Sequence, residues 1–331
     1  MKRPKALRTG TWDITAGRAD QGSVALSEIA ASGARYLAVV LATLLLAAVT
    51  LVFTPGSAAR ADTVFQSGQV FASVGFSTVN VYDQSSGNQI TSLVDSTNEQ
   101  FTAGSAFDAN GNFYVTDDFN GDISEFSPTG QPLPTFATGL TNPLSLVFDS
   151  SGNLYVGQQG TPYIAEFSSS GQRLPDIGPV LTGESGDDWI DLSSDQCTFY
   201  YTTETDQIYR YNKCTNTQLS NFNTSALPGP NAYELRILGN GDVLVADSTA
   251  VYMLDPSGNI LQTYSCSSMP GCANQLFAVV VDPSGTSFWT GDNFSGLIYQ
   301  INMSTGQVMQ TINAETADLF GLSVKGELDA A

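Results

Sequence analysis

Phe107-Asp-Ala-Asn-Gly-Asn-Phe-Tyr-Val115 and Phe148-Asp-Ser-Ser-Gly-Asn-Leu-Tyr-Val156 are two copies of one motif, and looser copies occupy residues 238–245 and 281–289. Each copy is an apolar segment, a tight turn and a second apolar segment. In such turns glycine accepts a positive φ, and an Asp side chain bonds its own backbone. The copies recur at roughly 40–45 residues, which is the period of β-propeller blades.

A second turn follows each motif, at residues 127–130, 168–171, 255–258 and 303–306. Between the turns, short segments alternate apolar and polar residues and are rich in aromatic and β-branched side chains, which is typical of β-strands. We therefore expect an all-β fold, a six-bladed β-propeller of four-stranded antiparallel blades that occupies residues 62–331. The expected second strands of the blades are Val70–Ser73, Phe113–Thr116, Leu154–Gly157, Phe199–Thr202, Val243–Ala246 and Phe288–Gly291.

The first expected blade has no inner strand of its own, because residues 62–68 are few and polar. A suitable strand occurs at the other end of the chain, in residues 319–324. We infer that this C-terminal strand pairs within blade one and closes the ring, which removes open sheet edges. Blade four lacks the turn glycine and has the pair Cys197 and Cys214, so we expect a crosslink to restrain the chain there.

Residues 1–61 are interpreted as an N-terminal basic region and signal peptide. Lys and Arg are frequent in residues 1–35, an apolar run that we expect to be helical covers 36–53, and Ala59-Arg-Ala61 fits a cleavage site. Cleavage after Ala61 would give a secreted or extracytoplasmic protein. The alternative is an uncleaved membrane anchor with the propeller outside, because the run is about long enough to span a bilayer.

The chain is strongly acidic, since 32 Asp and Glu residues against 12 Lys and Arg residues give a net charge of −20. Such a field repels nucleic acid, so we expect no nucleic-acid partner. It attracts Ca²⁺ and basic peptides or ligands, although acidity also keeps an exported protein soluble. We expect a monomer, with a membrane partner only if the apolar segment is retained. Beyond residue 61 the basic residues are Arg173, Arg210, Lys213, Arg236 and Lys325.

The four cysteines fall into two local pairs, Cys197 with Cys214 and Cys266 with Cys272. An even number of cysteines in an exported chain predicts two disulfides. Zinc binding is the alternative, but the spacing fits no known finger, and no histidine is present. The absence of histidine also excludes Ser-His-Asp and Cys-His catalysis. The chemistry that remains is that of carboxylates and amides.

The repeat, with its inner phrase V-x-D-x-x-G-x-x-Y-V, resembles the NHL-repeat propellers and the related gluconolactonase, paraoxonase and streptogramin-lyase group over residues 65–326. The streptogramin lyases depend on a histidine base, which this chain lacks. The resemblance to the lactonases implies a divalent ion, held at the top of the central channel by Glu, Asn and Asp, and such oxygen ligands suit Ca²⁺. The lactonase Glu belongs to the strand that pairs with blade one, but residues 319–322 contain no carboxylate.

Small residues share one position near the start of the expected inner strands, as in Gly104, Ser145, Ala278 and Gly321. Blade five has Glu234 at this position, and blade four has Ile190, or Asp191 if one residue is inserted. A carboxylate among small residues suggests a function. We therefore expect an acidic pocket at the channel mouth, formed by Glu234, Asp191 and Asp188 with Trp189 and Tyr233 as its wall.

Polar residues also follow the second strands, where the loops to the third strands lie on the same face as this mouth. We include Asp117, Asp247, Asp292 and Asn293 as ligand or metal candidates. The competing interpretation is that these Asp side chains cap turns, because Asn-Gly at residues 120–121 is a strong hairpin signal on its own.

Two functions of different classes fit these observations. The first, which we favour, is an exported binding or interaction module whose protein or small-molecule ligand occupies the acidic pocket. The second is a Ca²⁺-dependent hydrolase of the gluconolactonase or lactonase type, which would use carboxylates and a metal-bound water. No cofactor is certain, Ca²⁺ is the one considered, and no catalytic residue is identified.

Overall fold

The protein is described by a computed structural model over residues 64–94, 101–181 and 186–328. The predicted leader, residues 1–61 with its apolar core 36–53, lies outside the described residues. In the part of the chain that is described, no helix is long and apolar enough to cross a membrane. The single helix there is the short 3-10 helix η1 (Cys266–Ser268), and all other elements are strands.

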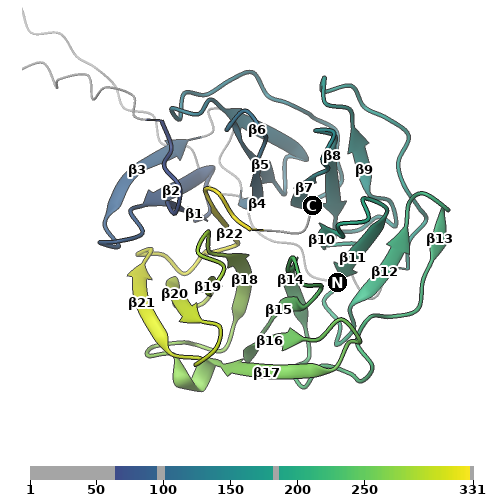
Figure 1. Cartoon of the computed structure of the whole chain (residues 1–331). Helices are drawn as coiled ribbons and strands as arrows, with labels where there is room; N and C mark the ends of the chain where they lie inside the picture. Colours follow the sequence, from purple (N-terminus) through teal and green to yellow (C-terminus); the bar gives the residue numbers. More distant parts are fainter. Residues whose placement is uncertain (1–63, 95–100, 182–185, 329–331) are drawn as a thin grey trace, which may run out of the picture. The chain divides into compact units, whose positions relative to one another are not determined.

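Six antiparallel sheets surround a common axis (Figure 1), which confirms the six-bladed β-propeller. Four of the six sheets contain four strands each. Ordered from the axis outward, blade one is β22 (Gly321–Val324), β1 (Val70–Ser73), β2 (Thr78–Tyr82) and β3 (Gln89–Val94), and blade four is β10 (Trp189–Leu192), β11 (Thr198–Thr202), β12 (Tyr209–Asn212) and β13 (Thr217–Gln218). Blade five is β14 (Ala232–Ile237), β15 (Val243–Asp247), β16 (Ala250–Leu254) and β17 (Ile260–Ser265), and blade six is β18 (Leu276–Val281), β19 (Ser287–Asp292), β20 (Leu297–Asn302) and β21 (Val308–Asn313).

Blades two and three differ from the prediction, because each has three continuous strands. Their fourth strand is reduced to isolated bridges, such as Ile123 with Ala137 and Ile164 with Ile177. Prolines in these outer segments, among them Pro132 and Pro134, cannot donate to a strand ladder. The strands are β4 (Thr102–Phe107), β5 (Phe113–Asp117) and β6 (Asp122–Phe126) in blade two, and β7 (Pro143–Phe148), β8 (Leu154–Gln158) and β9 (Ala165–Phe167) in blade three.

The ring closes as predicted through the C-terminal strand. β22 pairs antiparallel with β1, with Gly321 opposite Ser73 and Val324 opposite Val70. The backbone N–H of Phe320 also donates to the Ser73 carbonyl at 3.0 Å. Six hydrophobic clusters lie between neighbouring blades, including the one that joins blade six to blade one through Trp289, Leu319 and Leu322. The core therefore follows the ring, and each blade is buried against two others.

The turn that joins the first two strands of blade four shows how the chain replaces a missing glycine. Gln196 adopts φ +58° there, a left-handed conformation that glycine has at residues 111, 152, 241 and 285. The neighbouring Cys197 forms a disulfide with Cys214, and Cys266 forms the second disulfide with Cys272. Both predicted disulfides are confirmed, and they indicate an extracytoplasmic protein.

One alignment made from the sequence is wrong. In blade four, Trp189 lies opposite Thr202, as Ser145 lies opposite Gly157 and Ala278 opposite Gly291. Trp189, and not Ile190 or Asp191, therefore shares the position of Glu234. The alignment failed because blade four has no turn glycine from which its inner strand could be counted.

Candidate functional site

Each blade has two ends, and two names are used for them below. The upper rim is the side where the second strand of a blade turns into the third and where the chain passes to the next inner strand. The lower rim is the opposite side, where the first strand turns into the second. The sequence predicts the acidic pocket at the upper end of the axis.

Glu234 lies buried near the axis, where two partners hold its carboxylate. Its Oε2 accepts a hydrogen bond from the backbone N–H of Val279 in blade six at 3.0 Å, and its Oε1 is 2.7 Å from Nη2 of Arg236. Removal from water raises the pKa of Glu234 to about 7, although Arg236 and the Val279 N–H favour the charged form. Glu234 therefore connects the inner strands of two blades.

Asp191 has the same kind of partner one blade earlier. Its Oδ2 accepts from the N–H of Ile237 in blade five at 2.7 Å, and its Oδ1 accepts from Leu192 N–H at 2.8 Å. Ser145 accepts from the N–H of Ile190 at 3.0 Å in the same way. An innermost strand has an open edge toward the axis, and its buried N–H groups need acceptors. The side chains of the preceding blade supply them, which gives Glu234 and Asp191 a structural role.

Arg236 and Glu327 are charged residues at the axis that sequence reasoning did not select as site candidates. The Nε of Arg236 donates to Oε1 of Glu327 at 3.0 Å, so the guanidinium lies between Glu234 and Glu327. Glu327 follows β22 and also accepts from the N–H of Val281 at 2.7 Å. The sequence contained a signal for Arg236. Residues two apart on a strand point to the same face, so Arg236 had to lie on the same face as the candidate Glu234.

A cavity of about 320 Å³ opens at the lower end of the axis. Asp191, Arg236 and Glu327 belong to its wall, and the first-to-second-strand turns of blades two and three contribute Asp108 and Asp149. Asp191 thus lines the lower cavity, whereas the sequence predicts it in a pocket at the upper rim.

Aromatic rings gather at the upper end of the axis. Trp189, Tyr233 and Phe277 form a buried cluster, with Phe320 packed against it. Tyr233 and Phe277 have ring centroids 4.5 Å apart, and Phe277 is 5.6 Å from Trp189. Trp189 and Tyr233, proposed as a pocket wall, are 1% and 4% exposed, so they pack among themselves. Asp188 is fully buried next to Trp189.

The candidates in the loops of the upper rim mostly bond their own loops. Asp117 accepts from both nitrogens of Asn120, and the side-chain amide of Asn293 donates to Leu319 O at 3.1 Å. Asp247 accepts from Thr249 N–H at 3.3 Å, and burial raises the pKa of Asp247 to about 6. The contacts of Asp117 and Asp247 agree with turn capping, whereas Asn293 bonds the segment that precedes β22.

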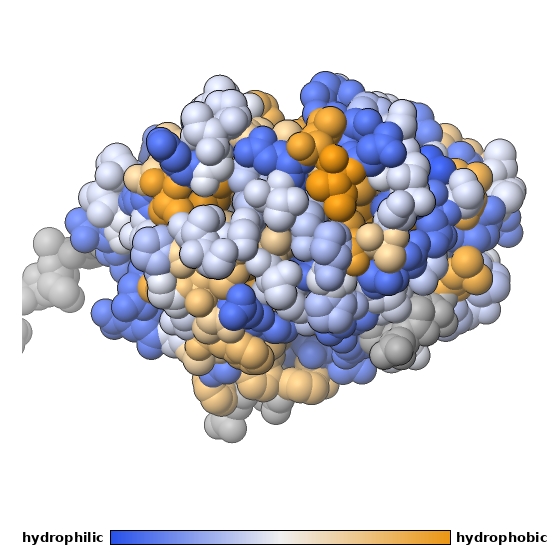
Figure 2. Space-filling view, turned by 90° about the horizontal axis from the view of Figure 1, so that it is seen from below, coloured by the Kyte–Doolittle hydropathy of each residue, from blue (hydrophilic) through white to orange (hydrophobic). Residues whose placement is uncertain are grey.

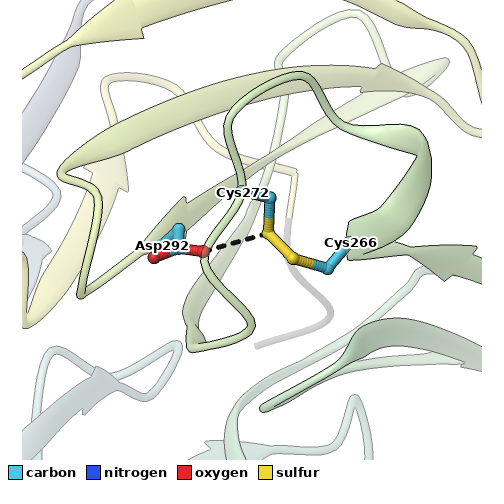
Figure 3. A group of neighbouring side chains, drawn as sticks. All are labelled: Cys266, Cys272 and Asp292. Atoms are coloured by element: carbon cyan, nitrogen blue, oxygen red, sulfur yellow. Dashed lines mark hydrogen bonds between the residues drawn. A yellow bond between two sulfur atoms is a disulfide. The ribbon is translucent and has the colours of Figure 1, made fainter.

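Asp292 lies beside the disulfide of Cys266 and Cys272 (Figure 3). Its Oδ1 accepts from the N–H groups of Phe294 and Ser295 at 3.0 and 2.9 Å. The Sγ of Cys272 is 3.0 Å from its Oδ2, but a disulfide sulfur has no proton to donate. Within residues 64–94, 101–181 and 186–328, these three residues are the one group of acidic or cysteine side chains close enough to share a metal ion. Glu234, Asp191 and Asp292 do not form such a group there, and calcium binding stays a prediction.

Exposed phenylalanines are the feature of the upper rim that the sequence analysis missed. Phe76, Phe119 and Phe294 are 65%, 59% and 61% exposed. Each lies in the loop between the second and third strands of its blade, in blades one, two and six, which are neighbours in the ring. These three loops thus place three phenylalanines on one side of the molecule.

Further rings connect this group to the buried cluster on the axis. The ring centroid of Phe101 is 5.7 Å from that of Phe76, 5.3 Å from that of Phe119 and 5.0 Å from that of Phe320. The ring centroids of Phe320 and Phe277 are 5.9 Å apart. The loop of Phe294 contacts the residue that precedes Phe320, since the side-chain amide of Asn293 donates to Leu319 O. We call Phe76, Phe101, Phe119, Phe294 and Phe320 the phenylalanine face. On the side of the ring shown in Figure 2, hydrophobic residues lie in separate groups among hydrophilic ones, as is usual on protein surfaces.

The comparisons with known proteins support the fold. No protein-family model and no curated protein matches the chain. The structure is similar to a chain in the crystal structure of a nidogen/laminin complex, with 14% identity over 78% of this chain and 97% of that chain and a TM-score of 0.63. It is also similar to a protein of unknown function from Bacteroides caccae (15% identity, 78% and 98% covered, TM-score 0.61) and to streptogramin B lyase (15%, 65% and 69%, 0.50). At these identities the similarity confirms the resemblance at the level of the fold.

The buried Glu234 gives a testable pH dependence. The folded state keeps the Glu234 proton up to pH of about 7, whereas the ordinary value is 4.5. The unfolded state loses this proton first, so the Glu234 contribution to stability is present below pH 4.5 and is lost as pH rises to about 7, by roughly 3 kcal/mol. Glu234→Gln should flatten this slope in urea unfolding between pH 4.5 and 7, and the exposed Glu315→Gln should not. Equal slopes in Glu234→Gln and the wild type would refute this assignment.

Proposed function

We propose that the protein is an exported binding module that holds a partner protein on the phenylalanine face of its upper rim. The observation that carries the proposal is the recurrence of an exposed phenylalanine in the same loop of three neighbouring blades. Contiguous exposed apolar groups mark interaction sites, and aromatic side chains are frequent anchors of interfaces. The acidic pocket of the sequence-based hypothesis is replaced here by an aromatic surface, because Glu234 and Asp191 have structural partners.

The backbone at Phe76 supports the same proposal. Phe76 has φ +43°, a conformation that is costly for a bulky residue and that glycine or asparagine adopts more easily. Because the residue is 65% exposed, burial within the chain offsets little of this cost. A bulky residue kept in such a conformation at the surface is a reason to infer a function for its side chain.

The test is a combined substitution on the phenylalanine face, Phe76→Asn with Phe119→Ser and Phe294→Ser. The full-length protein would be crosslinked in its native host, and the recovered partners would be quantified by mass spectrometry. We expect at least one partner to be retained by the wild type and to fall at least about tenfold in the variant, as loss of interface anchors predicts. The melting temperature should stay close to that of the wild type.

A matched control removes exposed apolar side chains from the outer strands β17 and β21. Ile260→Ser, Leu261→Ser and Met309→Ser should leave partner recovery unchanged. If the phenylalanine variant kept all partners, or if both variants lost them equally, the proposed surface would be wrong.

A further inference from the structure

The acidic character of the phenylalanine face indicates the chemistry of its partner. Asp118 precedes Phe119 in its loop, and both residues are on the upper rim. Asp318 lies beside the loop of Phe76, since a Cβ atom placed on Gly75 would be 3.2 Å from Cβ of Asp318 and 3.5 Å from the ring of Phe101. Two aspartates of intermediate burial thus lie beside the exposed rings, with Oδ1 of Asp118 buried.

Of the five Lys and Arg residues in the part of the chain that the structure describes, four lie over aromatic rings outside the phenylalanine face. Arg173 lies over Phe167, Arg210 over Tyr200 and Phe222, Lys213 over Tyr155, and Lys325 over Phe107, at 4.3–5.9 Å from the ring centroids. The fifth basic residue beyond position 61, Arg236, is paired at the axis. Within the described ranges, no Lys or Arg lies over a ring of the phenylalanine face.

An exposed aromatic ring attracts a cation to its face, and a neighbouring carboxylate adds to that attraction. Burial raises the pKa of the Asp118 carboxyl, so a nearby cation would favour its charged form. The net charge of −20 would in addition steer a basic partner toward the protein and repel an acidic one. An apolar partner without charge would use the rings but would gain nothing from the carboxylates.

We infer that the partner binds through a basic polypeptide segment, with Lys or Arg side chains over Phe76, Phe119 and Phe294 and close to Asp118 and Asp318. This inference rests on the proposed function and specifies the ligand of the same surface. Apolar side chains between the cations of the segment would contact the ring edges. Binding is then strong at low ionic strength and falls as salt screens the carboxylates.

The experiment uses three labelled peptides that share one leucine and glycine framework and carry arginine, glutamine or glutamate at the remaining positions. Affinities for the full-length protein would be measured by fluorescence anisotropy over a range of salt concentrations. We expect the arginine peptide to bind at least about tenfold more tightly than the glutamine peptide at low salt, a difference that salt reduces. The glutamate peptide should bind most weakly.

A pair of charge variants separates local contacts from the overall field. Asp118→Asn with Asp318→Asn should weaken binding of the arginine peptide several-fold and reduce the salt dependence of that binding. The affinity for the glutamine peptide should stay unchanged. The control, Asp176→Asn with Asp242→Asn, removes the same charge away from the phenylalanine face and should have a much smaller effect. The three-phenylalanine variant should lose binding of the arginine and the glutamine peptides.

The outcomes distinguish the inference from the function on which it rests. Equal binding of the three peptides, all lost in the phenylalanine variant, would overturn the basic partner and leave the binding surface in place. Arginine-peptide binding that is unchanged in the phenylalanine variant would overturn both. No binding of the arginine peptide, or equal losses in the two aspartate pairs, would also overturn the inference.

Discussion

Replacement of Arg236 by methionine is expected to destabilise the protein by about 3–5 kcal/mol at pH 7, because it removes the cation from a buried ion group and leaves the two acidic side chains in place. Arg236 lies between Glu234 and Glu327, with N···O distances of 2.7 and 3.0 Å. Methionine has a similar length but no charge, so Glu234 and Glu327 would be left in a desolvated space without their cation, and Glu234 would have to keep its proton at pH 7. The free energy of unfolding would be measured in urea.

The loss in Arg236→Met should also depend on pH. At pH 5 Glu234 keeps its proton in the wild type as well, so less of its attraction to Arg236 is there to lose, and the variant should lie closer to the wild type than at pH 7. The matched control is Arg210→Met. The guanidinium of Arg210 packs on the rings of Tyr200 and Phe222 at the outside of blade four, so its loss should lower the free energy of unfolding by about 1 kcal/mol or less. Wild-type stability of Arg236→Met at pH 7 would contradict the structural role assigned to this ion group.

Gly321→Ala is the second substitution with a large expected effect, because it acts where the ring closes. A Cβ atom on Gly321 would be 2.2 Å from the carbonyl oxygen of Ala103 in blade two. That atom belongs to the backbone, so blades one and two would have to separate at their inner strands. Overpacking of this kind should lower the free energy of unfolding by about 3 kcal/mol or more.

Gly239 provides the control for Gly321, because a Cβ atom there would meet nothing within 4 Å and the residue has no positive φ. Gly239→Ala should change the free energy of unfolding by about 1 kcal/mol at most, and in the stabilising direction. Comparable effects of the two substitutions would mean that Gly321 is not in close contact with the neighbouring blade.

The fold could be predicted from sequence because its information is local and repeated. Each turn has its own glycine or Asx residue, and each strand has its own alternation, so one copy of the motif supports the next. The closing strand followed from a count, since blade one lacked a strand and residues 319–324 were left over. The reduced outer strands of blades two and three were also visible in the sequence, through the prolines near residues 132–134 and at 175 and 179.

The site could not be predicted to the same extent, because its contacts join different blades. Glu234 bonds the N–H of Val279, 45 positions further along the chain, and nothing in the sequence near Glu234 indicates that partner. Glu327 comes from the tail that follows the last strand. Asp117 and Asp247, in contrast, bond within their own loops, and the capping alternative for them could be recognised in advance.

The phenylalanine face had a signal in the sequence that was not used. Phe119 and Phe294 each come two residues after an Asp that ends a second strand, in the corresponding runs Asp117-Asp-Phe119 and Asp292-Asn-Phe294. A large apolar residue in a turn position normally taken by polar residues has no role in folding the turn. Its exposure, however, depends on the packing around it, and only the structure provides that.

The central claim is that a ligand binds on the upper rim and not in the lower cavity. Hydrogen exchange of the full-length protein, with and without saturating arginine peptide, tests it most directly. The account predicts slower exchange in the loops 74–77, 118–121 and 293–296. Slower exchange confined to segments that line the lower cavity, residues 105–109, 146–149 and 323–327, would contradict it.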